Sequence, residues 1–153
     1  MKTVSRSKFA AAVSVLLLAA LATGCSSFSR GWKAALSTPP PEGDFSGAWT
    51  GSWRSNVTGH HGNLRCLVAR LDGSRYRARY KATYRKLFRF GYAVEMLVTR
   101  SGDGVFQFRG QADLGWWGGG VYRYEGTATA TNYFATYQSK YDHGTFQMTR
   151  PGR

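Results

Sequence analysis

The sequence is poor in negative charge. Its 153 residues include eight aspartates and glutamates, against 21 lysines and arginines. Asp72 and Asp103 stand beside glycine, and Asp142 stands two residues before one, in turn-like stretches. Glu95 and Glu125 alternate with apolar residues, where arginines such as Arg89 and Arg123 can pair with them. No nucleophile elbow, Walker loop or zinc-protease motif is present. We therefore expect no catalytic residues, no enzyme activity and no cofactor.

Histidine is also scarce, with three residues in the chain. His60 and His61 are adjacent, and His143 follows Asp142 far along the sequence. Adjacent residues of a strand point to opposite faces, so a histidine pair of this kind seldom chelates one ion. The pattern indicates polar loops rather than a metal site.

Long helical periodicity is missing, and a period of two takes its place from Phe45 onward. Apolar and polar residues alternate in about eight short segments. The inward faces of these segments begin at Phe45, Leu64, Tyr76, Phe90, Phe106, Tyr122, Tyr133 and Phe146. The sequence therefore predicts an all-β domain over residues 45–153.

Short connections separate these segments. Asp72-Gly73 and Gly102-Asp103-Gly104 favour tight hairpins, because such residues accept positive φ. Consecutive hairpins predict an antiparallel up-and-down meander, and closure into an eight-stranded barrel would remove the unpaired edges. A barrel that crosses a membrane needs an apolar outer face, which the arginine row of residues 75–85 contradicts.

The first 24 residues have the pattern of a secretory signal peptide. Lys2, Arg6 and Lys8 precede the apolar run 9–22, which ends in small residues before Cys25. The run is shorter than the roughly 20 residues that span a bilayer. Without this leader, 129 residues remain, and because it holds three basic and no acidic residues, their net charge is +10.

The stretch Leu21-Ala22-Thr23-Gly24-Cys25 resembles the lipobox of bacterial lipoproteins. The resemblance implies cleavage before Cys25, a lipid on its sulfur and acylation of the new amine, which together anchor the chain to a membrane. Ser26, where an aspartate would signal inner-membrane retention, favours the outer membrane of the cell envelope, facing the periplasm. A plain secretory signal cleaved elsewhere is the alternative.

Two cysteines are all that the chain contains. If Cys25 carries lipid, no internal disulfide is possible, whereas an unmodified Cys25 leaves a Cys25–Cys66 bridge open. Cys66 lies between Leu64 and Val68 at alternating spacing, which predicts a buried, unreactive side chain.

The segment 25–44 is predicted to be a tether between anchor and barrel. Thr38-Pro39-Pro40-Pro41 favours extended polyproline geometry and cannot join a sheet. Residues 32–36 are expected to form at most one helical turn, resting on lipid headgroups.

The barrel region resembles the lipocalin, or calycin, family. Gly47-Ala48-Trp49, or alternatively Gly51-Ser52-Trp53, resembles the first-strand G-x-W motif, and Thr131-Asn132-Tyr133 is similar to the T-D-Y motif, with asparagine replacing aspartate. Arg150 resembles the arginine that packs across the first-strand tryptophan, and residues 114–151 resemble bacterial outer-membrane lipocalins. The family implies an eight-stranded barrel that holds a small apolar ligand, such as a fatty acid or lysophospholipid.

Aromatic side chains dominate the predicted inward face and are the candidate ligand-binding residues. They are Trp49, Trp53, Tyr76, Tyr80, Tyr84, Tyr92, Tyr122 and Tyr124. A buried phenol hydroxyl needs a partner, so these tyrosines indicate a wet lumen, a ligand with a polar head, or hydroxyls that reach solvent at the barrel ends. Trp116 and Trp117 are candidates for a lid, for headgroup contact or for a partly buried strand end.

The opposite face of the same segment is basic and is the second candidate site. Its members are Arg75, Arg77, Arg79, Lys81 and Arg85. Such a row either binds anions in a salt-dependent way or is a solvated exterior. Two functions stay open: a membrane-anchored lipoprotein that binds a small amphiphile, or an adaptor that binds an anionic envelope polymer or a protein through this face. Nucleic acid is less accessible outside the cytoplasm.

Overall fold

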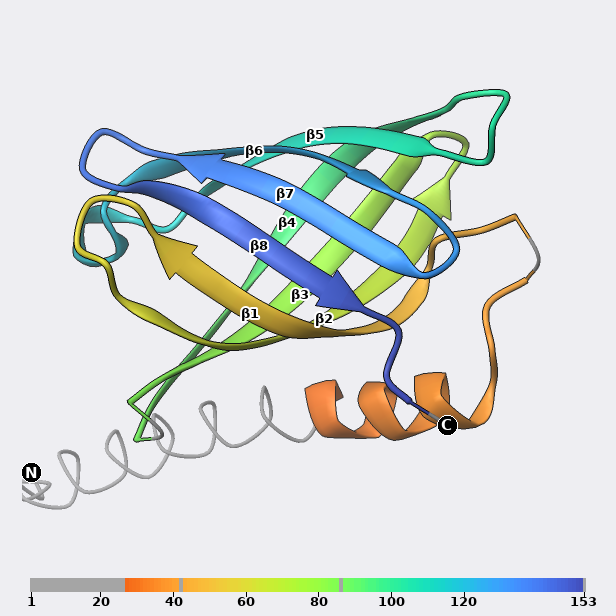
Figure 1. The fold of residues 1–153 in the computed structure, drawn as a ribbon, viewed down its shortest axis with the longest axis horizontal. Coiled ribbons are helices and arrows are strands. Elements are labelled where there is room, and N and C mark those ends of the chain that lie inside the picture. The colour runs from red at the N-terminus through yellow and green to blue at the C-terminus, as the bar shows by residue number, and fades with distance from the viewer. Residues whose placement is uncertain (1–26, 42, 86, 153) are drawn as a thin grey trace, which may run out of the picture.

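The computed structural model of the chain describes residues 27–41, 43–85 and 87–152. Eight antiparallel strands follow one another in chain order, and β1 pairs with both β2 and β8, so the sheet closes into a barrel (Figure 1). The strands are β1 (Gly47–Ser55), β2 (His61–Asp72), β3 (Arg75–Tyr84), β4 (Phe88–Arg100), β5 (Phe106–Asp113), β6 (Val121–Ala128), β7 (Asn132–Gln138) and β8 (His143–Thr149). The predicted all-β meander barrel is confirmed.

Alternation along each strand separates the barrel interior from its surface, as β3 illustrates. Tyr76, Ala78 and Tyr80 are buried, whereas Arg75 and Arg77 are exposed. Apolar side chains from all eight strands therefore share one interior core. Closure pairs every strand on both sides, which leaves no free sheet edge.

The two ends of the barrel differ. We call the end with the connections after β1, β3, β5 and β7 the open end; these connections lie on the left of Figure 1. The other end is closed by Phe45, which precedes β1 and is fully buried. Its ring centroid lies 4.9 Å from that of Tyr76 and 5.2 Å from that of Phe106. Phe45 thus plugs the closed end with aromatic contacts.

An α-helix over residues 27–37 lies on the outside of the barrel, where a tether was predicted. Phe28, Trp32 and Ala35 recur at helical spacing and pack against Ala48 of β1 and Leu67 of β2. The apolar side chains on this side of the barrel give the helix a surface to bury, which a short segment lacks when considered alone. Cys25, Ser26 and the leader 1–24 lie outside the described residues.

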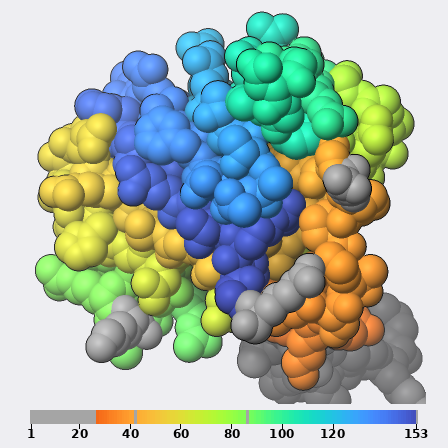
Figure 2. Space-filling model, turned by 45° about the vertical axis from the view of Figure 1, so that its right-hand side comes forward, coloured from red at the N-terminus to blue at the C-terminus, as the bar shows by residue number. Residues whose placement is uncertain are grey.

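The proline segment after the helix returns the chain to the closed end. In Figure 2 this orange segment lies on the barrel surface, near the blue C-terminal strand. Pro39 and Pro40 line a groove with Ala130, Arg150 and Pro151. Within the described residues, no helix is both long and apolar enough to cross a membrane.

Candidate functional site

The open end of the barrel contains a cavity of about 480 Å³. Its deepest lining residues are the buried Leu64, Ala82, Tyr124 and Phe146, and its walls are mainly aromatic. The wall and rim residues are Trp53, Phe90, Tyr92, Leu114, Trp117, Tyr122, Tyr137 and Asp142. A volume of this size, mostly apolar with few polar groups, is typical of small-molecule sites.

Among the described residues that line the cavity, Asp142 is the one with a charged side chain. Its carboxylate accepts a hydrogen bond from Ser55 Oγ at 2.6 Å and another from the Tyr137 hydroxyl at 3.1 Å. The Ser55 hydroxyl in turn accepts from the backbone N–H of Thr58. This network joins the turn after β1 to the turn after β7 and engages both carboxylate oxygens.

The predicted ligand-binding aromatics divide into two groups along the barrel axis. Trp53, Tyr92, Tyr122 and Tyr124 line the cavity. Tyr84 lies at the rim, with its ring centroid 6.2 Å from that of Trp53. Trp49, Tyr76 and Tyr80 also point inward, but they belong to the packed core and do not line the cavity.

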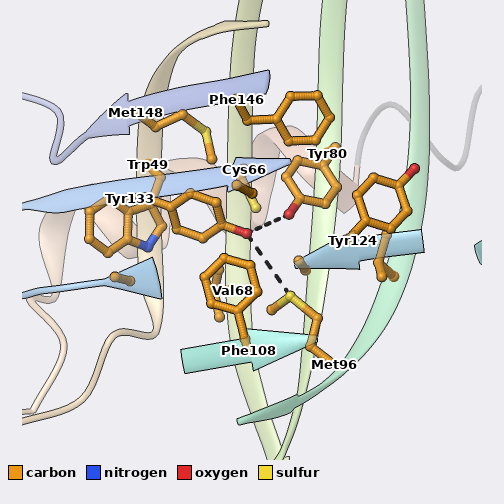
Figure 3. Close-up of a cluster of buried hydrophobic side chains, with 14 of the residues drawn as sticks. Trp49, Cys66, Val68, Tyr80, Met96, Phe108, Tyr124, Tyr133, Phe146 and Met148 are labelled. Carbon is orange, nitrogen blue, oxygen red and sulfur yellow. Dashed lines mark hydrogen bonds between the residues drawn. The ribbon is translucent and has the colours of Figure 1, made fainter. Parts of the chain in front are cut away.

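The hydroxyls of the packed core pair with one another. Those of Tyr80 and Tyr133 are 2.5 Å apart, and the Tyr133 hydroxyl also lies 4.0 Å from Met96 Sδ (Figure 3). No buried side-chain nitrogen or oxygen among the described residues lacks a partner. Burial raises the pKa of Tyr80, Tyr92 and Tyr133 well above the usual value. At this depth Tyr80 and Tyr133 require neither water nor a ligand headgroup.

Cys66 is fully buried and free, as predicted. Burial raises the pKa of its thiol, which opposes formation of the reactive thiolate. The side chain acts as a small apolar residue in the core beside Tyr80 and Tyr133 (Figure 3).

Trp49, rather than Trp53, is the partner of Arg150. The guanidinium carbon lies 3.8 Å from the Trp49 ring centroid, and Nη1 donates to the Ser46 carbonyl at 2.8 Å. Gly47 permits this approach, because its φ of 102° and the nearby guanidinium disfavour a side chain. Burial lowers the pKa of Arg150 to about 10, which leaves it cationic at neutral pH. The contact seals the closed end.

Several cavity residues were not among the sequence candidates. Phe90, Tyr137 and Phe146 were assigned to inward faces, but nothing in their spacing showed that they would surround a void. Ser55 and Asp142 come together from positions 87 residues apart. Trp117 lines the cavity, but its side chain is 92% exposed. It therefore lies at the rim of the cavity and does not cover the opening as a closed lid.

The basic row of β3 points outward but does not act as one surface. Arg75 pairs with Asp72, and Arg77 Nη2 lies 2.6 Å from Glu95 Oε1. The hydrogen bond from Arg75 lowers the pKa of Asp72. Glu95 thus pairs with a member of the row itself. Arg85 follows β3, with a φ of 48° in the turn.

Two further cations on the outer face of the barrel, one on β2 and one on β3, face the helix. Lys81 Nζ lies 5.5 Å from the Phe28 ring centroid, and the Arg65 guanidinium lies 5.1 Å from that of Trp32. A groove of about 370 Å³ separates the helix from β2, β3 and β4, and four cations line it. They are Lys33, Arg65, Lys81 and Arg89, and no acidic residue is among the described lining.

Among the described residues, no three histidine, cysteine, aspartate or glutamate side chains lie together as a set of metal ligands. The chain was compared with family models, with curated proteins and with solved structures, and no significant match was found in any of the three. The candidate site is therefore defined by its geometry: an aromatic cavity open at one end of the barrel and packed shut at the other.

Proposed function

We propose that this protein binds a small amphiphile with one apolar chain, of the fatty-acid or lysophospholipid type, in the cavity at the open end, without catalysis. The observation that carries the proposal is the cavity of about 480 Å³, lined by aromatic side chains above a packed floor. A void of this kind leaves apolar surface in contact with water, and an apolar chain that fills it removes that surface from water.

The distribution of polar groups favours an amphiphile over a wholly apolar ligand. The buried floor residues Leu64, Ala82 and Phe146 suit an apolar tail. The phenols of Tyr92 and Tyr122 belong to the wall, and the cations Arg85 and Lys140 are exposed on the turns of the same end. A tail directed to the floor would place its head near these groups.

The leader and Cys25 supply the second part of the proposal, the location. A lipidated Cys25 would hold the barrel on the outer membrane of a bacterial envelope, facing the periplasm. The lipocalin-like motifs support the ligand-binding part of the proposal instead, since Trp49 and Arg150 make the contact that the resemblance implies. Incorporation of labelled palmitate that is lost in Cys25→Ala tests the anchor separately from the ligand.

The ligand is tested by titrating the tryptophan fluorescence of the chain 26–153 with lysophospholipid below its micelle concentration. This chain contains all eight strands and the described core. Trp53 and Trp117 line the cavity and report on occupancy. We expect a saturable change with one ligand per barrel that persists at high salt.

Two matched variants locate the binding event. Ala82→Leu adds three carbons at the buried cavity floor, whereas Ala93→Leu adds the same carbons on the exposed face of β4. We expect Ala82→Leu to weaken binding at least tenfold and Ala93→Leu to leave it unchanged. Equal affinity in both variants, or no saturable change in the unaltered chain, would refute binding in this cavity.

A further inference from the structure

Exposed apolar side chains gather at the open end of the barrel. Of the twelve large hydrophobic side chains that are exposed among the described residues, eight lie on or beside its turns. The eight are Val57, Leu87, Phe88, Phe90, Trp116, Trp117, Val121 and Tyr141. Of the other four, Leu71 lies beside the turn after β2 at the closed end, and Leu36, Leu97 and Phe134 are scattered elsewhere.

Two protruding tips account for the most exposed of these residues. Trp116 and Trp117 stand at 82% and 92% exposure on the 3₁₀ turn between β5 and β6, with ring centroids 4.5 Å apart. Leu87 and Phe88 stand at 82% and 63% on the turn between β3 and β4. Exposing such large apolar side chains to water is unfavourable. Tryptophan is enriched in the headgroup layer of membranes, so an adjacent pair suits that environment.

Cations flank these tips. Arg85 and Lys140 are exposed on the turns after β3 and β7, and Arg89 lines the cationic groove beside the helix. Among the described residues, two carboxylates lie at this end: Asp142 accepts hydrogen bonds from Ser55 and Tyr137, and Asp113 accepts one from the N–H of Gly115. Both keep their negative charge, and the three cations outnumber them. Apolar tips with cations beside them match an anionic phospholipid surface in both hydrophobicity and charge.

The helix gives an independent indication of which side of the protein faces the membrane. Phe28, near its start, lines the groove with Thr83 at the end of β3 and Arg89 at the start of β4, so the helix begins toward the open end (Figure 1). The described part of the chain therefore starts, at Ser27, on this side of the protein. A lipid on Cys25 would enter the membrane on the side of the protein where the tips protrude.

We propose that the open end of the barrel docks on an anionic phospholipid bilayer, with Trp116, Trp117, Leu87 and Phe88 entering the headgroup layer. The cations of the rim and of the groove then face the lipid phosphates. The mouth of the cavity opens onto the membrane, from which an amphiphile can enter without crossing water. The docking surface stands whether or not the cavity takes a ligand.

Co-sedimentation with vesicles tests the docking with the chain 26–153, so that a lipid anchor does not contribute. The vesicles are phosphatidylcholine alone and phosphatidylcholine mixed with phosphatidylglycerol. We expect binding to the mixed vesicles, weakened by salt, with blue-shifted tryptophan emission. The triple variant Leu87→Ser, Phe88→Ser, Trp116→Ser should lower the partition coefficient about tenfold or more, because these side chains no longer bury apolar area.

The matched control replaces three exposed apolar residues away from the open end: Leu71→Ser, Leu97→Ser, Phe134→Ser. We expect it to bind vesicles as the unaltered chain does. Neither triple variant changes a cavity residue, so both should titrate with lysophospholipid as before. This separates failure of docking from failure of the proposed ligand binding, and it also shows that both variants fold.

Three results would overturn the docking surface. The first is that the unaltered chain fails to bind the mixed vesicles. The second is that the variant Leu87→Ser, Phe88→Ser, Trp116→Ser (the rim variant) binds them as well as the control variant does. The third is that the rim variant still binds the vesicles, whereas the double variant Lys81→Gln, Arg89→Gln does not. That last result would assign binding to the groove alone, as expected for a surface that takes anionic polymers.

Discussion

The paired hydroxyls of Tyr80 and Tyr133 test whether the barrel interior below the cavity is dry. Both side chains are about 1% exposed, and their oxygens are 2.5 Å apart. Replacing either tyrosine by phenylalanine removes one hydroxyl and leaves the other buried without its main partner. Leaving a buried polar group unsatisfied costs about 1–3 kcal/mol. Each single variant should lose that much of the free energy of unfolding.

Each single variant leaves the remaining hydroxyl one weak sulfur partner: Met96 Sδ, 4.0 Å from the Tyr133 hydroxyl, in Tyr80→Phe, and the Cys66 thiol, beside the Tyr80 hydroxyl, in Tyr133→Phe. The two single variants should therefore lose similar amounts of stability, and the double variant should cost less than their sum. The double variant removes both hydroxyls together and leaves no unsatisfied group, which is close to neutral. The double-mutant cycle should therefore give a coupling energy of at least about 2 kcal/mol, which is the sum of the two single costs.

Urea unfolding followed by tryptophan fluorescence measures these differences by linear extrapolation. Tyr141→Phe, at a residue 67% exposed, is the control and should leave the midpoint unchanged. Neutral single variants would refute the reasoning, because they would mean that water replaces the missing partner. The aromatic cavity would then extend as a wet channel past Tyr80 toward the closed end.

Further predictions concern the closed end, the core phenols and the helix. Arg150→Ala should lower the free energy of unfolding by about 2–4 kcal/mol in urea titrations, because it removes the contact with Trp49 and the hydrogen bond to Ser46; an unchanged midpoint would contradict this. The raised pKa values of Tyr80 and Tyr133 keep their phenols neutral in the folded barrel, whereas the unfolded chain ionises near pH 10. Their stability contribution is complete below about pH 10 and lost as the pH rises further, so tyrosinate absorbance from these residues should appear together with unfolding. Trp32→Ala should speed amide hydrogen exchange in the helix 27–37 and leave exchange in the strands unchanged, because the helix packs on the outside of the closed sheet; equal acceleration in both would refute separate docking.

The sequence alone predicted the eight strands and the inward or outward direction of nearly every side chain in them. These follow from local geometry, since successive side chains of a strand alternate between faces. The arginines of β3 lie outside and its tyrosines inside for this reason. The turns after β2 and β4 followed from glycine and aspartate, and the burial of Cys66 from its apolar neighbours at alternate positions. His61 and His143, predicted to lie in polar loops, are instead the first residues of β2 and β8.

The sequence did not show how deep in the barrel each inward residue lies. Trp49 and Trp53 have the same motif and the same face, yet one meets Arg150 in the packed core and the other lines the cavity. Depth depends on the register between strands that are distant in the chain, and on the Phe45 plug. The network of Ser55, Tyr137 and Asp142 arises only when the turns after β1 and β7 meet.

Alternation thus determined the strands, their two faces and the aromatic character of the inward face, because it is a property of each strand by itself. The tertiary structure decided which end is open and which aromatic residues surround a void. It also decided that residues 27–37 fold as a helix on the outside of β1 and β2. Each of these depends on surfaces contributed by several strands at once. A short amphipathic segment such as 27–37 becomes a stable helix only when another surface buries its apolar side.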